Sequence, residues 1–160
     1  MTLGYVRKRF MKLTRTVVCS IVVAVTVAAP ALAALGEDAT SVQTDLVKMK
    51  GALRITSSAG FTVHEIATSN GTVVREYLSP AGKVFAVSWR GPMMPDLSQM
   101  LGTYYEQFLQ APSAAHVRQR HLSIEQPGLV VQSSGRMRAF FGRAWVPQLL
   151  PQNFSVNEIN

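Results

Sequence analysis

Two glutamates on neighbouring predicted strands come closest to a catalytic pair. Residues 61–67 and 72–78 are rich in β-branched and aromatic side chains and flank Asn70 and Gly71, which are typical of a two-residue type I′ hairpin turn. With that turn, Glu65 lies directly opposite Glu76. Opposed β-carbons about 5 Å apart would crowd the carboxyl groups and match the short separation of a retaining glycosidase. The alternative is that both carboxylates face solvent or pair with basic side chains such as Lys83.

His64 and Arg75 are the other chemistry-bearing side chains of this hairpin. In the same register His64 lies opposite Tyr77, and Arg75 lies on the packed face. Adjacent strand residues face opposite sides of a sheet, so His64 and Glu65 cannot bind one metal ion together. A hydrogen-bonded, partly buried histidine is expected instead. Arg75 needs a partner, because an unpaired buried guanidinium is costly, and it forms either a structural ion pair or a site for an anionic group.

The remaining polar clusters give weaker signals. Arg136, Arg138 and Arg143 form a modest basic patch, which is either a binding surface or protection of a strand edge. His116 and His121 lie in a predicted loop without fixed geometry, so no metal site is expected there. The sequence contains no glycine-rich phosphate loop, nucleophile elbow or HExxH motif, and we predict no cofactor.

The first 33 residues have the pattern of an export signal. Five Lys and Arg residues precede an uncharged apolar run, and Ala-Leu-Ala at residues 31–33 is a small-residue cleavage site. We expect cleavage between Ala33 and Ala34, which places residues 34–160 in the periplasm or outside the cell. Residues 16–36 are also long enough to span a bilayer if they are not removed, so an uncleaved anchor stays open. Translation from Met1 or from Met11 also stays open.

The charge and cysteine content of the chain depend on that signal. The net charge of +7 comes from 16 basic and nine acidic residues, but five of the basic residues and none of the acidic ones precede Ala34. The remainder has 11 basic and nine acidic residues, a net charge of +2, which gives no case for a nucleic-acid partner. Cys19 is the only cysteine, so the mature domain has no disulfide, thiol nucleophile or cysteine metal site.

The mature chain has the pattern of a single α+β domain: an antiparallel sheet packed with one long and one short helix. The sheet consists of a three-strand meander and a C-terminal hairpin that turns at Ser134 and Gly135. The long helix begins at the N-cap Asp96 and ends before Pro112, and it packs on the face that carries His64. The short helix covers residues 38–50, and residues 111–128 form a mobile loop. The expected strands are residues 61–67, 72–78, 83–89, 129–133 and 136–141.

Several segments resemble a known family. They are Val-Arg-Glu-Tyr at 74–77, Gly-Lys-Val-Phe-Ala-Val-Ser-Trp at 82–89, Gly-Pro at 91–92, Pro-Asp-Leu at 95–97, Leu-Gly-Thr-Tyr at 101–104 and Arg-Met-Arg-Ala-Phe-Phe-Gly-Arg-Ala at 136–144. Together they resemble small exported proteobacterial proteins catalogued as domain of unknown function 2844. The resemblance covers nearly the whole mature chain and implies export and a single domain. It brings no activity, cofactor or catalytic residue. The segment at 71–84 is also similar to hairpins of PepSY-type and cystatin-like modules, in fold only.

Three functions fit these observations. The leading hypothesis is a non-catalytic module that binds an envelope or extracellular protein or polymer, and that contacts the membrane only through an uncleaved signal. A hydrolase of cell-wall or polysaccharide material, with Glu65 and Glu76 as acid and base, is the first alternative. An envelope-assembly factor is the second. The sequence leaves the ligand and the oligomeric state open.

Overall fold

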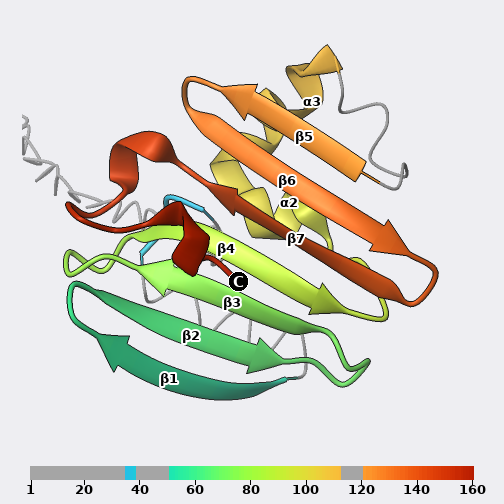
Figure 1. Cartoon of the computed structure of the whole chain (residues 1–160), viewed down its shortest axis with the longest axis horizontal. Coiled ribbons are helices and arrows are strands. Elements are labelled where there is room, and N and C mark those ends of the chain that lie inside the picture. The colour runs from blue at the N-terminus through green and yellow to red at the C-terminus, as the bar shows by residue number, and fades with distance from the viewer. Residues whose placement is uncertain (1–34, 39–50, 113–120) are drawn as a thin grey trace, which may run out of the picture.

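A computed structural model describes residues 35–38, 51–112 and 121–160 of the chain. In this part of the chain, the strands form one antiparallel sheet in the order β1-β2-β3-β4-β7-β6-β5 (Figure 1). The strands are β1 (Ala52–Ser58), β2 (Phe61–Ala67), β3 (Val73–Leu78), β4 (Val84–Gly91), β5 (His121–Gln126), β6 (Leu129–Arg136) and β7 (Ala139–Trp145). The α+β prediction is therefore confirmed in outline, but β1 and β5 were not predicted. Each of them is an edge strand.

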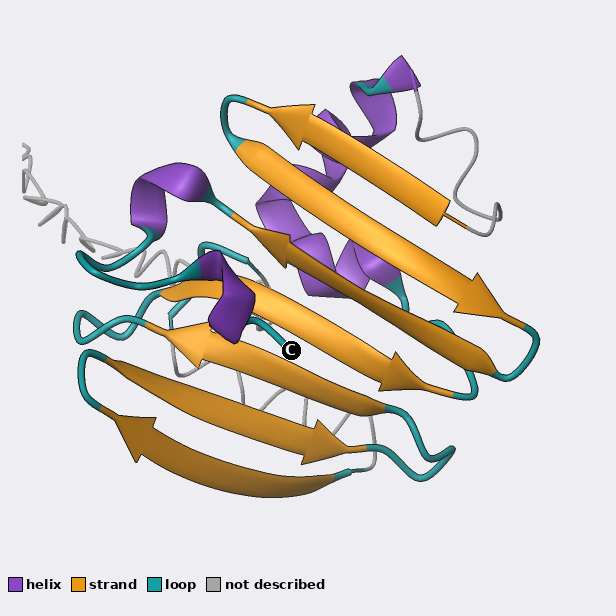
Figure 2. Ribbon diagram, viewed as in Figure 1, coloured by secondary structure: helices purple, strands orange, loops and turns teal. Residues whose placement is uncertain are grey.

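The helical elements lie on opposite faces of the sheet (Figure 2). The helix of α2 (Leu97–Leu101), η2 (Gly102–Tyr104) and α3 (Tyr105–Gln110) covers one face, here called the helix face. The chain after β7 crosses the other face and includes η4 (Pro147–Leu149) and η5 (Val156–Glu158). We call residues 153–160 the C-terminal segment and the face that it crosses the tail face.

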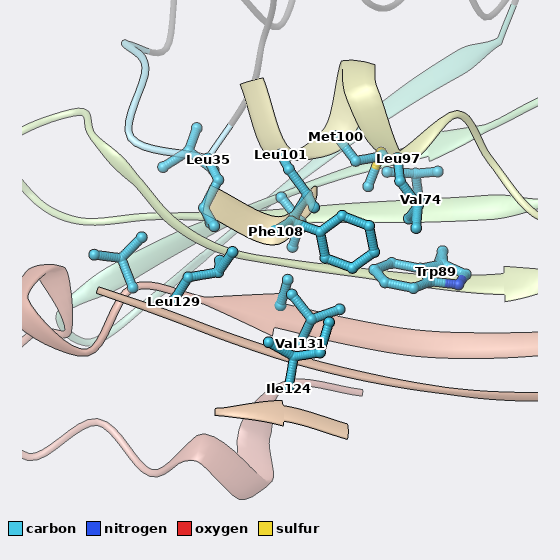
Figure 3. Packing of buried hydrophobic residues seen from close by; sticks show 14 of the residues in the cluster. Leu35, Val74, Trp89, Leu97, Met100, Leu101, Phe108, Ile124, Leu129 and Val131 are labelled. Atoms are coloured by element: carbon cyan, nitrogen blue, oxygen red, sulfur yellow. The ribbon is translucent and has the colours of Figure 1, made fainter. Parts of the chain in front are cut away.

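Most of the core lies between the sheet and the long helix. Met100, Leu101 and Phe108 of the helix are almost fully buried and belong to one apolar cluster with strand residues such as Trp89 and Val131 (Figure 3). A second cluster lies on the tail face around Tyr77, Phe85 and Trp145. The sheet is thus covered by apolar contacts on both faces, although the tail face is covered only over part of its area.

The long helix begins where the sequence predicts. The side chain of Asp96 accepts a hydrogen bond from the backbone N–H of Ser98 at 2.9 Å, as an N-cap should. The helix is interrupted at Gly102, whose φ of 49° is left-handed and cannot continue an α-helix. The predicted long helix is therefore divided into two α-helical parts joined by η2, and its apolar stripe packs on the sheet as expected.

The first hairpin has a longer loop than Asn70 and Gly71 predict. Thr68 N–H donates to the oxygen of Thr72 at 2.9 Å, so three residues form the loop, and Gly71 takes a φ of 84° at its end. One extra loop residue shifts the register by one position and turns every following side chain to the other face. The predicted pairing of Glu65 with Glu76 is therefore wrong, since Glu65 lies opposite Arg75.

The predicted turn at Ser79 is present, but the register after it also differs. Gly82 N–H donates to the oxygen of Ser79 at 2.8 Å, and Gly82 has the expected left-handed φ of 76°. A β-bulge then lies between Tyr77 and Leu78 in the pairing with β4, so that Tyr77 pairs with Ala86. As a result Tyr77, Phe85 and Arg75 face the C-terminal segment, not the long helix as predicted.

The last hairpin turns later than predicted. Gly135 is inside the β6–β7 ladder, where it pairs with Phe140, and the turn lies at Met137 and Arg138. A β-carbon on Gly135 would lie 2.6 Å from the Phe140 ring, so this glycine makes room for the ring and does not form the turn. Arg138 takes the left-handed φ of 62°.

Two predicted segments fall partly outside the described residues. Residues 39–50 of the predicted short helix lie outside them, and Asp38 forms a bridge with Lys83. Of the predicted mobile loop at 111–128, residues 113–120 lie outside the described part, but His121–Gln126 is strand β5, so the loop prediction is wrong there.

We predict that Gly142→Ala destabilises the protein. A β-carbon on Gly142 would lie 2.6 Å from Trp89 Cε2 and 2.8 Å from the Gln132 oxygen, and neither the buried ring nor the backbone can move away. Overpacking of this kind costs about 1–3 kcal/mol of unfolding free energy, measured by urea denaturation. Gly128→Ala is the control, because its β-carbon would meet only the flexible end of Gln107 at 3.2 Å. Equal stability of the two variants would contradict this packing.

Candidate functional site

The two candidate catalytic glutamates lie on opposite faces of the sheet. Glu65 is on the tail face, where its Oε2 accepts a hydrogen bond from Arg75 Nε at 2.8 Å. Glu76 is fully buried beside Val87, a member of the helix-face core. One substrate therefore cannot contact both carboxylates, and the structure does not assemble the proposed acid and base.

His64 lies across from Glu76 on the helix face and is partly buried. Burial lowers the pKa of its imidazole, because desolvation disfavours the charged form. Its Nδ1 is buried and has no hydrogen-bond partner among the described residues. The expected pairing of His64 with Tyr77 is wrong, because the strand register is shifted by one residue, as it is for the two glutamates.

A row of polar residues crosses the tail face from one edge strand to the other. Its members are cross-strand neighbours, one from each strand in spatial order. They are Arg54, Glu65, Arg75, Ser88, Arg143, Gln132 and Ser123. Within the row, Glu65 neutralises Arg75, whereas Arg143 contacts only neutral acceptors among the described residues.

The C-terminal segment is held on this row through its main chain. The main-chain oxygen of Asn160 accepts hydrogen bonds from Arg75 Nη1 at 2.7 Å, Ser88 Oγ at 2.9 Å and Tyr77 Oη at 3.1 Å. The Tyr77 oxygen in turn accepts from the Asn160 N–H at 3.0 Å. Arg75 is therefore part of a structural ion pair and an anchor for the segment, which is the structural alternative of the sequence analysis.

Arg143 fixes the other side of the segment. Its Nη1 donates to the oxygen of Val156 at 2.9 Å, and its Nε donates to Gln132 Oε1 at 3.0 Å. The guanidinium also lies over the ring of Trp145, 5.4 Å from the centroid, in a cation–π arrangement. These contacts hold the guanidinium at a defined position on the tail face.

Aromatic packing completes the attachment. The ring of Phe154 meets Phe85 edge to face at 4.7 Å and Phe61 at 5.1 Å between centroids, and Ile159 is almost fully buried. Edge-to-face pairs of this kind add to the free energy gained from burial alone. The segment is thus anchored by apolar side chains at both ends and by main-chain hydrogen bonds between them.

A groove of about 460 Å³ lies between the C-terminal segment and strands β4, β7, β6 and β5. Its lining residues come from these four strands and from the C-terminal segment, and two of them, Gln132 and Arg143, belong to the polar row. They are Trp89, Arg90, His121, Gln132, Ser133, Ser134, Phe141, Gly142, Arg143, Asn157, Ile159 and Asn160. This volume suits a small molecule or one unit of a polymer.

The charged side chains in the lining are basic. Arg90 and His121 are exposed and Arg143 is half-buried, while these lining residues include no Asp or Glu. The ring of Phe141 is 50% exposed and offers an apolar surface beside them. Gln132 and Asn157 supply amide groups. The groove can therefore bind an anionic group and pack a flat or apolar part of the same ligand.

Sequence reasoning found only part of this site. Of the three arginines of the predicted basic patch, Arg143 lines the groove, whereas Arg136 and Arg138 are not among its lining residues. His116 lies outside the described residues. Arg90 was missed, and only its cross-strand pairing with Phe141 could have indicated it.

The described residues contain neither a cluster of metal-binding side chains nor a helix that could span a membrane. No group of three or more His, Cys, Asp or Glu side chains that could hold a metal ion occurs among the described residues. None of the helices in the described ranges is long and apolar enough to cross a membrane.

Comparison with known families identifies the chain. A family model described as "Protein of unknown function (DUF2844)" matches residues 31–159. The chain belongs to this family. Neither the curated proteins nor the solved structures gave a match to the chain.

We predict that His64 makes stability depend on pH. Because the folded-state pKa of His64 is lowered, the unfolded chain takes up its proton first as the pH falls. Stability is complete above the unfolded pKa of about 6.5 and decreases below it until the folded form also titrates. Urea denaturation at about pH 7.5 and about pH 5.5 measures the loss.

A variant without the imidazole tests the assignment to His64. His64→Gln should reduce the loss of stability at the lower pH, because it removes the group that the unfolded chain protonates first. The same loss in His64→Gln and in the unmodified protein would contradict the assignment.

Proposed function

We propose that this protein is an exported, non-catalytic binding module whose ligand lies in the groove beside the C-terminal segment. The observation that carries the proposal is the lining: Arg90, Arg143 and His121 line the groove together with a half-exposed Phe141, and no Asp or Glu side chain is among the lining residues. The ligand is an envelope or extracellular molecule, or a polymer unit, that bears a carboxylate or a phosphate. Export rests on the signal pattern of residues 1–33.

Recognition fits these residues better than hydrolysis. A carboxylate pair is the usual apparatus of glycoside hydrolysis, and the two glutamates of the sequence hypothesis lie on opposite faces of the sheet. His121 and Ser134 are opposed across β5 and β6, but no Asp or Glu side chain lines the groove to orient the imidazole as a catalytic base. Arginine, amide and aromatic groups instead provide binding energy and orientation.

Arg90→Gln should weaken binding of an anionic ligand. Arg90 is exposed, and its side chain has no hydrogen bond or ion pair with a described residue. The substitution therefore removes a positive charge without disturbing the fold. Calorimetric titration with trigalacturonate as the carboxylate probe and pyrophosphate as the phosphate probe measures the effect. We expect a roughly tenfold loss of affinity, about 1.4 kcal/mol, for the probe that binds.

Arg54→Gln is the matched control for this titration. Arg54 is also an exposed arginine of the tail face, but it lies on edge strand β1, and three strands separate β1 from β7. Its removal changes the net charge equally and should leave affinity unchanged. Absence of binding by both probes, or equal losses in the two variants, would exclude the groove as an anion site.

Removal of residues 1–33 is the expected result of export. Expression of the full chain in a Gram-negative host, followed by cell fractionation and intact-mass measurement, should recover from the periplasm a protein that begins at Ala34. Recovery of the intact chain in the membrane fraction would mean that the signal is not cleaved and anchors the protein in the membrane. An intact chain in the cytoplasm would contradict export.

A further inference from the structure

Exposed apolar side chains gather at one end of the sheet. In the described ranges, Met137 is 93% exposed, Met93 55% and Phe141 50%. Met137 lies in the turn between β6 and β7, and Met93 is the second residue after the end of β4. Gly91 at the end of β4 pairs with Phe140 beside that turn, so these residues belong to the same end of the sheet (Figure 1). We call this end, with its arginines, the basic tip.

Three arginines surround these side chains. Arg90, Arg136 and Arg138 are all exposed, and none of their side chains forms an ion pair or hydrogen bond with a described residue. In sequence, Arg136 and Arg138 flank Met137 on both sides. Asp96 is the acidic residue that follows β4 most closely, and its carboxylate is bonded to Ser98. The basic tip therefore presents unneutralised positive charge around apolar side chains.

A hollow of about 410 Å³ lies between these arginines. It is lined by Arg90 and Arg138 together with Pro92, Phe140 and Phe141. Two guanidinium groups at the rim of one hollow suit the oxygens of a phosphate, for which arginine is well shaped. This hollow shares Arg90 and Phe141 with the groove, whereas Arg138 lines only the hollow at the tip.

The turn itself is unusual for a water-exposed loop. Hairpin turns favour Gly, Asn and Asp, because they adopt a left-handed backbone easily. Here the left-handed residue is Arg138, at a φ of 62°, and the residue before it is an almost fully exposed methionine. Neither residue is favoured by the turn, so turn formation does not explain this pair.

We propose that the basic tip docks on the surface of an anionic lipid bilayer. Met137 and Met93 enter the boundary between headgroups and acyl chains, while Arg90, Arg136 and Arg138 contact lipid phosphates. Surface-bound proteins commonly combine apolar side chains at this depth with basic residues that attract anionic lipids. Methionine suits the role because its unbranched side chain adapts to an irregular environment. The inference does not rest on the groove, since Met137, Arg136 and Arg138 do not line it.

Vesicle co-sedimentation tests this docking. The exported protein is mixed with vesicles of phosphatidylcholine alone or with about one-third phosphatidylglycerol, and partition constants are measured at low and raised salt. The protein should partition more strongly onto the anionic vesicles, by tenfold or more, and raised salt should weaken this preference. Met137→Ser combined with Arg138→Gln should abolish the preference.

A matched double variant keeps this test independent of the N-terminal segment and of the net charge. Ile55→Ser combined with Arg54→Gln removes an exposed apolar residue and an arginine from edge strand β1, and it should retain the preference. Circular dichroism checks that both double variants are folded.

Three results would overturn the inference. The first is equal partition onto both kinds of vesicle. The second is loss of the preference in both double variants, which indicates an effect of net charge alone. The third combines two observations: Met137→Ser alone keeps the full preference for anionic vesicles, and trigalacturonate abolishes vesicle binding by competition. Together they would assign the basic tip to a soluble anionic polymer. Neither Met137 nor Arg138 lines the groove, so Met137→Ser combined with Arg138→Gln should leave the binding of the soluble probes intact, and either site can fail without the other.

Discussion

The three hydrogen bonds to the main-chain oxygen of Asn160 are the interaction on which the tail face depends. Arg75, Tyr77 and Ser88 donate these bonds from two neighbouring strands, and they converge only because β3 and β4 have the observed register. A one-residue slip of β3 would turn Arg75 and Tyr77 to the other face. The C-terminal segment forms one wall of the groove, so the loop length of the first hairpin and the bulge before β4 determine whether the groove exists.

Some charged side chains of the tail face hold the structure together, and others are free to bind a ligand. Glu65 neutralises Arg75, and that pair is committed to the C-terminal segment. Arg143 has both roles: it donates a hydrogen bond to the main-chain oxygen of Val156, and because that acceptor is neutral, its positive charge remains available at the groove. Arg90 has no structural contact of this kind. The result is a surface on which charged groups are positioned for recognition, while the carboxylates needed for acid–base chemistry are neutralised or on the other face.

Local signals in the sequence predicted more of this fold than long-range ones. Asp96 as a cap and Gly82 in its turn are confirmed, because each depends on residues within four positions. The predicted strand register was wrong because a single loop residue determines it. Asn70 and Gly71 fit a two-residue loop as well as a three-residue loop, and the hydrogen bond of Thr68 with Thr72 forms the three-residue loop. Strand β1 was missed because its alternation is short: Leu53 and Ile55 alternate with polar residues, but two serines follow, and every residue of the strand except Leu53 is exposed. The groove could not be predicted, since it needs residues 157–160 to lie against strands that precede them by up to 70 positions.

The attachment of the C-terminal segment to the sheet is the central claim, and amide hydrogen exchange tests it most directly. In the unmodified protein the amides of Ile159 and Asn160 donate to Val156 and to the Tyr77 hydroxyl, so both should exchange far more slowly than in a free peptide. Tyr77→Phe should speed exchange of Asn160 and of the residues around it, while exchange in the strands of the sheet stays the same. Exchange of residues 156–160 at the free-peptide rate in the unmodified protein would contradict the account.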